Sequence, residues 1–415
     1  MKILHINAVY GVGSTGVIVE DLVEMGKISG VDSYVAYSTG KEFDSKKGYI
    51  IGSVLEKKLH AVLSRLTGKQ AYYSKIGTRR LLSYMEKVCP DIVHLHNLHS
   101  NYINLNMILN YLAKNNIKTV VTLHDCWFYT GGCFHYTAVG CTRWMEQCGD
   151  CPNLKRECIS YLKDNTIKIL QDRKKFFGQI KNLYLVGVSK WIEEEAKKTV
   201  FAGRPSTYIY NGVDTEFFKP VFSDFRKKYC LEGKFLILGM ANKFFLDINR
   251  ETFNVTINNL EEDERLILVG CNQKQIDSLP EKVIGIPYVF DRAELRIIYS
   301  ACDVFVNCTR EESLSLVNVE AQACGTPVIT YASTGVKETV DGYCGFAVKV
   351  GEPLEIVKKI REVRKMDYKE LSHNCRMWVC DTFEVRKNYQ KYIELYENIR
   401  KGKIDEQGKN RKNFT

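Results

Sequence analysis

The sequence predicts an α/β protein of two tandem units, each a parallel sheet wound with helices. Short runs rich in β-branched and aromatic residues alternate with longer stretches of helical periodicity along most of the chain. A length of 415 residues exceeds what one hydrophobic core usually serves, which favours two domains. Turn residues at 203–205 interrupt the pattern, so we expect the domain boundary there.

Each unit has its own series of expected strands. In the N-terminal domain, residues 1–203, they span residues 2–6, 32–37, 91–96, 118–123 and 183–188. In the C-terminal domain, residues 204–385, they span residues 207–210, 235–239, 265–269, 283–286, 303–307 and 327–330. Helical spacing of apolar residues predicts a terminal helix over 386–400, followed by a disordered basic tail, residues 401–415.

Composition narrows the class of protein. With 45% apolar and 26% charged residues and no long apolar run, the chain is expected to be globular and not to span a membrane. Residues 1–6 enter a short apolar stretch without the features of a signal peptide, which favours the cytoplasm. The formal net charge of +10 attracts phosphates, anionic lipid and nucleic acid alike, so charge alone does not choose a partner.

Residues 303–327 read as a strand, a polar loop, a helix and a turn. Ser313 is the expected N-cap of a helix over residues 314–323, and Gly325 stands where a left-handed C-terminal cap is expected. The helix would begin at the carboxyl edge of a parallel sheet, where α/β proteins bind ligands. Its unpaired amide groups and dipole suit a diphosphate.

Two carboxylates accompany this expected anion site. Glu312 stands at the helix entrance and Glu320 lies in its second or third turn. A diphosphate repels a carboxylate, unless the carboxylate accepts hydrogen bonds from hydroxyls such as those of ribose or a sugar. The pair therefore indicates a sugar nucleotide, and the alternative is two solvated surface charges.

Residues 312–327 resemble the signature of glycosyltransferase family 4. In this segment seven residues separate Glu312 from Glu320, and Ala-Gln-Ala-Cys-Gly-Thr-Pro follows. Segments 90–96, 121–125, 188–190, 209–214 and 338–342 agree with it in order and spacing, so the resemblance covers residues 1 to about 400. It implies the GT-B fold, in which two Rossmann-like domains face a cleft, and a C-terminal helix that packs back on the first domain. It also implies a retaining transferase.

The resemblance assigns roles to single residues. It implies that Glu312 contacts the donor sugar, that Glu320 contacts the ribose, and that His124 touches the transferred sugar. Asp125 would orient His124 or bind the acceptor. The further implied substrate-binding residues are Gly13 and Ser14 of a glycine loop, Asn211, and Ser313, Leu314, Ser315 and Leu316 at the phosphate.

The chain departs from the family pattern after residues 235–239. The family has an arginine and then a Lys-Gly pair there, whereas this sequence offers Lys243 and Arg250, followed by Glu251. Both cations are also common as surface charges. With no second carboxylate placed as a nucleophile, we expect front-face substitution, in which Arg250 and Lys243 stabilise the leaving diphosphate. No Asp-x-Asp motif is present, so no metal cofactor is expected for the reaction.

Six cysteines lie in an expected insert, residues 126–158. Cys133, Cys141, Cys148 and Cys151 could supply four thiolates to a structural zinc, with reduced thiols or a disulfide as alternatives. The aromatic residues of the insert would either face sugar or lipid, or pack in a core. The segment 127–133 and the later cysteines resemble bacterial exopolysaccharide glycosyltransferases of the colanic-acid type.

A basic stretch, residues 56–80, interleaves lysines and arginines with apolar residues. It could rest on an anionic membrane surface that presents a polyprenyl-linked acceptor, or be a solvated helix face. The predicted function is transfer of a hexose-type sugar from a UDP- or GDP-linked donor to a glycan or lipid-linked saccharide for surface polysaccharide. The alternatives are an epimerase or phosphorylase, an inactive sugar-nucleotide-binding subunit, and a nucleic-acid-binding protein, for which no reading module is present.

Overall fold

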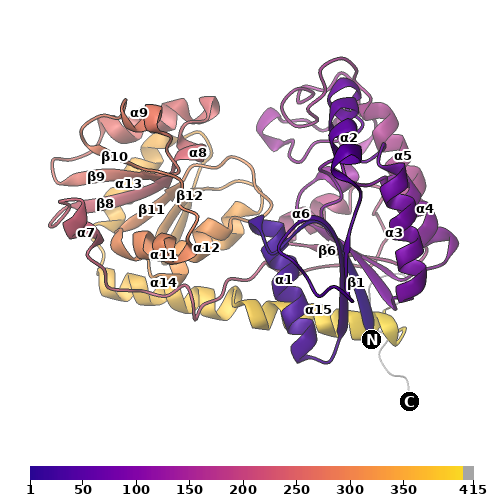
Figure 1. Ribbon diagram of the computed structural model, residues 1–415. Coiled ribbons are helices and arrows are strands. Elements are labelled where there is room, and N and C mark those ends of the chain that lie inside the picture. Colours follow the sequence, from indigo (N-terminus) through magenta and orange to yellow (C-terminus); the bar gives the residue numbers. More distant parts are fainter. Residues whose placement is uncertain (405–415) are drawn as a thin grey trace. The chain divides into compact units, whose positions relative to one another are not determined.

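The computed structural model describes residues 1–404 and divides the chain into two compact units (Figure 1). The N-terminal unit comprises Met1–Tyr210 and the chain from Asn388 onward, and the C-terminal unit comprises Asn211–Lys387. Of the predicted tail, residues 401–415, the part from residue 405 lies outside the described residues. Each unit is built on one parallel sheet, as the alternation of strands and helices predicts.

The N-terminal sheet has seven parallel strands in the order β3-β2-β1-β4-β5-β6-β7. They are β1 (Lys2–Tyr10), β2 (Asp32–Gly40), β3 (Gly48–Ile50), β4 (Ile92–Leu95), β5 (Thr119–Leu123), β6 (Leu183–Gly187) and β7 (Ser206–Tyr208). The helices are α1 (Gly13–Ile28), α2 (Val54–Thr67), α3 (Lys75–Val88), α4 (Leu105–Lys114), α5 (Thr166–Gly178) and α6 (Lys190–Ala196). The chain order reverses between β1 and β4, which makes this the switch point of the sheet.

The C-terminal sheet has six parallel strands in the order β10-β9-β8-β11-β12-β13. They are β8 (Phe235–Met240), β9 (Glu264–Val269), β10 (Val283–Ile286), β11 (Val304–Asn307), β12 (Val328–Tyr331) and β13 (Gly345–Val348). The helices are α7 (Phe225–Lys228), α8 (Ala241–Phe244), α9 (Arg250–Asn258), α10 (Gln273–Ile276), α11 (Arg292–Ala301), α12 (Leu316–Ala323), α13 (Pro353–Val363) and α14 (Tyr368–Thr382). Here the switch point lies between β8 and β11.

The sheet interiors follow from the apolar runs of the sequence. Ile3, Leu4 and Ile6 of β1 are fully buried, as expected for a strand covered by helices on both faces. Each expected strand overlaps an observed one, but the short β3 and β13 were not predicted. The segment predicted to open the second domain, residues 207–210, instead contributes β7, which pairs with β6. The N-terminal unit therefore continues to Tyr210.

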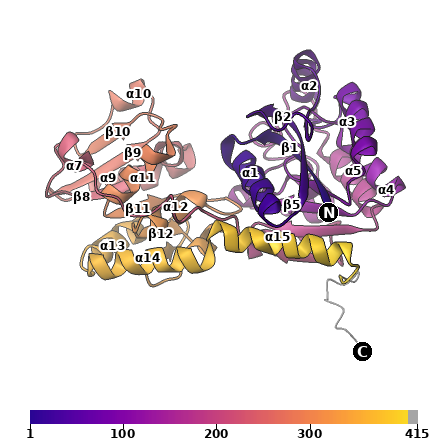
Figure 2. The same ribbon diagram turned by 60° about the horizontal axis from the view of Figure 1, so that its bottom comes forward.

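The C-terminal helix α15 (Val385–Arg400) joins the N-terminal unit from Asn388 onward, as the resemblance implies (Figures 1 and 2). Its buried face carries Tyr392 and Tyr396. The Tyr396 hydroxyl lies 2.6 Å from His94 Nδ1 and the Tyr392 hydroxyl lies 3.1 Å from Thr122 Oγ1. These bonds tie the helix to side chains of β4 and β5.

Candidate active site

The switch point of the C-terminal sheet brings together two predicted site residues and Thr334, which was not predicted. Lys243 follows β8, Glu312 follows β11 and Thr334 follows β12, and these three strands are neighbours in the sheet. The carboxyl ends of parallel strands meet at one edge, so residues 69 and 22 positions apart in sequence are brought together. A polar, partly buried site results.

Glu312 lies at the centre of this group. Its Oε1 accepts a hydrogen bond of 2.5 Å from Lys243 Nζ, and both side chains are about three-quarters buried. The Glu312 amide donates to Thr334 Oγ1, which donates in turn to the Glu312 carbonyl. Glu312 Oε2 is buried and has no hydrogen-bond partner among the described residues. A buried carboxylate oxygen in this state can accept a hydrogen bond from a ligand hydroxyl.

The helix after Glu312 starts later than the sequence predicts. Its first residue is Leu316 and its N-cap is Ser315, rather than Ser313. The Ser315 hydroxyl accepts from Asn307 Nδ2 at 2.9 Å and caps no amide of α12, while Ser313 Oγ is buried without a hydrogen-bond partner in the described chain. The tertiary bonds of Asn307 and Thr334 hold the loop extended up to Ser315. The helix does end as predicted, with Gly325 at φ +81°.

Asn249 was not singled out from the sequence, although it organises this site. It is fully buried, and its Nδ2 donates to the carbonyls of Lys243 and Cys308 at 2.9 and 3.0 Å. Its Oδ1 accepts from Arg310 Nε at 3.0 Å. Asn249 therefore joins the segment that carries Lys243 to the loop that leads to Glu312. No local pattern marks such a residue, because two of its three partners lie 59 and 61 positions away.

Arg250, the other predicted phosphate cation, has different surroundings. Its guanidinium donates to Asp247 at 2.7 Å, and the side chain is 74% exposed. An ion pair so open to solvent contributes little to stability. The structure therefore brings Lys243 to Glu312 and leaves Arg250 paired with its neighbour in sequence.

Glu320 lies on α12, partly buried beside Tyr299 of α11. The Tyr299 hydroxyl donates to Glu320 Oε2 at 3.3 Å. Burial raises the pKa of Glu320 to about 7, against smaller opposing effects of Arg292 and of the Tyr299 hydroxyl. Asn211, at the start of the same unit, is also buried, and its Oδ1 has no hydrogen-bond partner among the described residues.

The glycine loop of the N-terminal unit follows β1 at its switch point. Gly11 and Gly13 have φ values of +65° and +63°, and Gly13 and Ser14 are exposed. No side chain of the described residues caps the first turn of α1, which leaves its amides open to an anion. Asn7 fixes the loop, since its Nδ2 donates to the carbonyls of Val9 and Thr15.

His124 and Asp125 follow β5 and face different partners. Burial lowers the pKa of His124 to about 4, so the ring is neutral at pH 7. His124 Nδ1 is buried without a hydrogen-bond partner in the described chain. Burial alone would raise the pKa of Asp125, but the neighbouring His99 ring and the hydrogen bond from the amide of Trp127 lower it overall. Asp125 Oδ2 lies 3.3 Å from His99 Nε2, and among the described residues it makes no hydrogen bond to His124.

Half-buried His124 ends a chain of three histidines, of which His96 and His5 are fully buried. Its Nε2 lies 3.2 Å from His96 Nδ1, and His96 Nε2 lies 3.2 Å from His5 Nδ1. His94 lies beside this chain, but its two nitrogens bond to Tyr396 and Thr122. Although His5, His94 and His96 are close enough together for a metal ion, the hydroxyls and neighbouring rings already occupy most of their nitrogens. We interpret the group as a hydrogen-bonded network.

The cysteines form a group different from the predicted one. Cys133, Cys151 and Cys158 come together, with sulfur–sulfur distances of 3.8 to 4.0 Å. Cys158 replaces Cys141 and Cys148 of the predicted set, because the chain turns back after Cys151 and the Cys158 amide bonds to the Asn153 carbonyl. Cys148 lies next to this group, against Gly131.

The aromatic residues of the insert pack inward, as the core alternative predicts. Trp127, Tyr129, Tyr136 and Trp144 are buried. The buried Arg173 guanidinium lies 4.1 Å from the centre of the Trp127 ring. Most of these rings are therefore not available to bind sugar or lipid.

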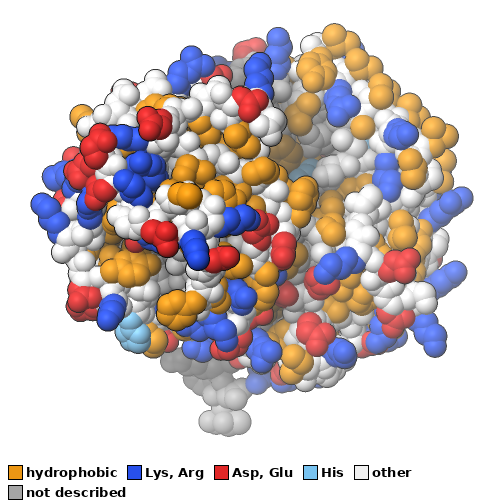
Figure 3. Space-filling model, turned by 60° about the vertical axis from the view of Figure 1, so that its left-hand side comes forward, with side chains coloured by type: hydrophobic (Ala, Val, Ile, Leu, Met, Phe, Trp, Pro, Cys, Tyr) orange, Lys and Arg blue, Asp and Glu red, His pale blue; other side chains and the backbone are white. Residues whose placement is uncertain are grey.

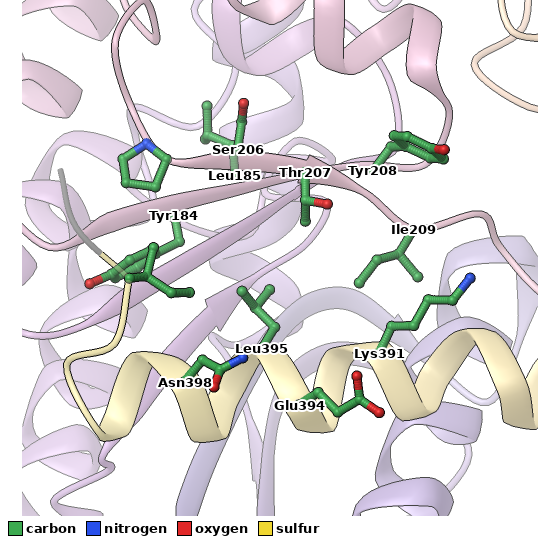
Figure 4. A pocket seen from close by; sticks show the side chains of 12 residues that line it. Tyr184, Leu185, Ser206, Thr207, Tyr208, Ile209, Lys391, Glu394, Leu395 and Asn398 are labelled. Carbon is green, nitrogen blue, oxygen red and sulfur yellow. The ribbon is translucent and has the colours of Figure 1, made fainter. Parts of the chain in front are cut away.

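A pocket of about 330 Å³ lies elsewhere in the N-terminal unit (Figure 4). It is formed by the edge strands and the upper face of α15, from which Lys391, Glu394, Leu395 and Asn398 point toward β7. It is lined by none of the predicted site residues, all of which lie in the described part of the chain. The volume of this pocket alone does not assign it a chemical role.

The surface charge is mixed on the face shown in Figure 3, where basic and acidic side chains are interspersed. The net charge of +10 therefore does not appear there as a field of one sign. Among the described residues, no helix is both long and apolar enough to cross a membrane.

Comparisons with known proteins show the family and the fold of the chain. The model of glycosyltransferase family 4 matches residues 17–217, and that of glycosyl transferases group 1 matches residues 255–377. The chain is a family 4 glycosyltransferase. WcaC of Escherichia coli, named for colanic acid biosynthesis, is 22% identical to this family 4 enzyme over 96% of the chain and 100% of its own length. The predicted family and the resemblance to a colanic-acid glycosyltransferase are thus confirmed.

Solved structures share the fold of this family 4 enzyme. Sucrose-phosphate synthase from Thermosynechococcus elongatus superimposes with a TM-score of 0.69 at 18% identity, covering 97% of this chain and 99% of its own. HepE from Anabaena, solved in complex with UDP-glucose, has a TM-score of 0.63 at 16% identity, covering 96% and 100%. Both matches span the two units and support the predicted GT-B fold.

Proposed function

We propose that this glycosyltransferase moves a hexose-type sugar, with retention, from a UDP- or GDP-linked donor to a glycan or lipid-linked saccharide of a surface polysaccharide. The observation that carries the proposal is the Lys243–Glu312 pair at the C-terminal switch point, with Glu312 Oε2 open to a hydroxyl. The relatives named for colanic acid synthesis and solved with UDP-glucose point to the same chemistry. The absence of a spanning helix from the described residues fits a cytoplasmic enzyme.

In the proposed complex, Lys243, helix α12 and the two glutamates each bind a different part of the donor. Lys243 and the first amides of α12 are proposed to hold the diphosphate, whose charge both groups complement. Glu312 then accepts from a sugar hydroxyl, and Glu320 accepts from the ribose. Because Lys243 remains beside Glu312, the carboxylate keeps a neutralising partner when the anionic donor arrives.

The proposed reaction is substitution on one face of the sugar. The bond from the anomeric carbon to the diphosphate oxygen breaks, and the acceptor oxygen bonds to that carbon from the same side. The acceptor proton passes to the departing phosphate oxygen. Lys243 and the helix amides stabilise the charge that develops there, with Arg250 as a second cation after it leaves Asp247. Neither step uses a resident metal ion.

His124 is proposed to bind a hydroxyl of the transferred sugar through Nδ1. A neutral imidazole has one N–H and one acceptor nitrogen, so the two His–His bonds couple the tautomers of His124, His96 and His5. His96 and His5 are thus positioning residues that determine whether His124 Nδ1 donates or accepts. Imidazole ¹⁵N NMR should show one dominant His124 tautomer, and a His96→Phe variant should show a mixture. An unchanged tautomer in that variant would refute this coupling.

Helix α2 is the proposed contact with an anionic membrane. Leu55, Leu59, Val62 and Leu66 form an exposed stripe at helical spacing, although His60 on the other face is buried. Exposed basic residues flank the stripe, as in helices that lie in a lipid interface. A Leu55→Ser, Leu59→Ser variant should no longer float with phosphatidylglycerol vesicles. Leu354→Ser, an exposed leucine of α13, is the matched control, and equal flotation of all three proteins would reject the contact.

A thermal-shift screen against UDP- and GDP-sugars tests the donor directly, since a ligand of the folded state raises Tm. At least one donor should raise it and be consumed in a transfer assay with a glycan acceptor. No shift with any donor of either series would overturn the proposal. A catalytically impaired donor-binding subunit is the second candidate, because Arg250 is exposed and paired away from Glu312. A donor-dependent shift with neither transfer nor hydrolysis would select that candidate.

A further inference from the structure

The insert after β5 is long for a segment without regular structure. Within residues 124–165, all of them described, the chain forms three short 3-10 turns and neither α-helix nor strand. Loops of this length inside a compact domain are uncommon unless they are functional or held by a cross-link or metal. Buried aromatic rings anchor the first half of the insert. The second half must be tied down by other contacts.

Three thiols from the two halves converge there in a nearly equilateral triangle. Cys133 Sγ lies 3.8 Å from Cys158 Sγ and 4.0 Å from Cys151 Sγ, and the last two are 4.0 Å apart. A tetrahedral zinc with Zn–S bonds of about 2.3 Å places its sulfur ligands about 3.8 Å apart. A disulfide needs about 2.05 Å and would leave one of the three thiols unpaired.

We propose that Cys133, Cys151 and Cys158 bind one structural Zn²⁺ ion, with Cys148 as the fourth ligand. Cys148 and Cys151 form a Cys-x2-Cys pair, a spacing common to structural zinc sites. Cys148 Sγ lies against Gly131 and near enough to Cys151 for their charges to interact, and the proposal requires this side chain to turn toward the ion. The site is separate from the transfer reaction and does not rest on the proposed function.

Two glycines leave the space that the sulfur atoms occupy. A Cβ at Gly131 would lie 2.8 Å from Cys148 Sγ and 2.7 Å from the Thr166 carbonyl oxygen. Gly132 has φ +131°, and a Cβ there would lie 3.2 Å from Cys158 Sγ. The Gly-Gly-Cys sequence that precedes the first thiol thus fits a close approach of backbone to sulfur.

A buried cation offsets the negative charge of such a site. Four thiolates around Zn²⁺ carry a net charge of −2, which is costly to bury alone. The Arg173 guanidinium is buried, donates to the Thr130 carbonyl and lies near enough to Cys148 and Cys158 to interact with their charges. Arg173 also stacks on Trp127, so its guanidinium would connect the zinc-bound cysteines to the aromatic half of the insert.

Metal content of the full chain tests the site without any activity assay. Protein purified through a tag that contains no histidine should hold about one zinc ion per chain by mass spectrometry. Cys133→Ser, Cys151→Ser and Cys158→Ser should each lose it, while Cys141→Ser, a matched thiol of the same insert outside the group, should keep it. Wild-type protein that binds no zinc even when refolded with it would overturn the proposal, as would equal loss in Cys141→Ser.

Two further measurements exclude a trivial folding failure. Cys158→His replaces one zinc ligand by another, so it should retain zinc and near-native circular dichroism. Co²⁺ in the wild-type protein should show thiolate-to-cobalt charge-transfer absorption, and Cys148→Ser should weaken Zn²⁺ binding at least about tenfold. A folded Cys158→His protein without zinc would contradict the Cys158 assignment, and unchanged zinc affinity in Cys148→Ser would contradict the fourth ligand.

Discussion

The two switch points share one topology and differ in their chemistry. In the N-terminal unit, burial lowers the pKa of His5 to about 3 and of His124 to about 4, so these rings are polar but uncharged at pH 7. In the C-terminal unit, Lys243 and Glu312 form a partly buried ion pair. Both regions leave buried polar atoms without hydrogen-bond partners among the described residues, namely His124 Nδ1 and Glu312 Oε2.

This difference teaches which part of a substrate each region suits. A neutral ring can donate to or accept from a hydroxyl without competing for charge. A lysine beside open helix amides suits a diphosphate, and the carboxylate suits hydroxyls close to it. We therefore infer that the fold supplies two switch points of similar topology, and that a few side chains determine which part of the substrate each one binds.

The largest expected effect comes from Glu312. Glu312→Gln keeps the shape but removes the charge that pairs with Lys243 and the strong acceptor at Oε2, so kcat/KM should fall about 10²–10³-fold. Glu352→Gln, at an exposed pair with Lys349, serves as the control and should retain the wild-type rate. A Glu312→Gln enzyme with at least half of the wild-type kcat/KM would show that the charged region is not the catalytic one.

The second comparison sets Lys243 against Arg250. Lys243→Ala should lower kcat about 100-fold, because it removes the cation next to the leaving group. Arg250→Ala should lower kcat by no more than about tenfold, because this second cation starts in an exposed pair with Asp247 and contributes less to the leaving group. Steady-state kinetics of the two variants checks the order. The reverse order would place the phosphate site at Arg250.

A smaller effect should appear in the pH dependence of donor binding. The pKa of Glu320 is raised to about 7, so the carboxylate that accepts from the ribose forms as pH rises through that value. Donor Kd should therefore decrease about fivefold to tenfold between pH 6 and pH 8. Isothermal titration with wild-type and Glu320→Gln protein tests this, since the variant should have a flat profile. A wild-type Kd that increases with pH would reverse the assigned role.

The smallest expected effect concerns His124, which should not contribute to the pH dependence of kcat. Burial lowers its pKa to about 4, so the ring stays neutral across pH 6–8 and should add no inflection to the pH profile of kcat. In the Glu320→Gln background, kcat should vary less than about twofold over this range. A histidine-like inflection near pH 6.5 that disappears in His124→Gln would contradict the neutral ring.

The sequence predicted the strands well because buried parallel strands leave continuous apolar runs. It singled out Glu312 and Glu320 as candidate donor-binding residues because their spacing belongs to a family signature. It did not predict the start of α12 at Leu316, since the bonds that extend the loop come from Asn307 and Thr334.

Long-range contacts explain the other differences. Asn249 carries no chemical signature, and its role depends on carbonyls distant in sequence. Cys158 was counted among the six cysteines of the insert, yet its place beside Cys133 depends on a turn after Cys151. His94 and His96 lie in the segment 90–96 that agrees with the family, whereas the link from His96 to His5 crosses from the end of β4 to β1.

The central claim is that the Lys243–Glu312 region binds the nucleoside diphosphate. Isothermal titration of UDP and of GDP into the wild-type, Lys243→Ala and Glu352→Gln proteins tests it most directly. At least one of the two nucleotides should bind the wild-type and control proteins equally and the Lys243→Ala protein at least about tenfold more weakly. Equal affinity of all three proteins for the nucleotide that binds would contradict the account.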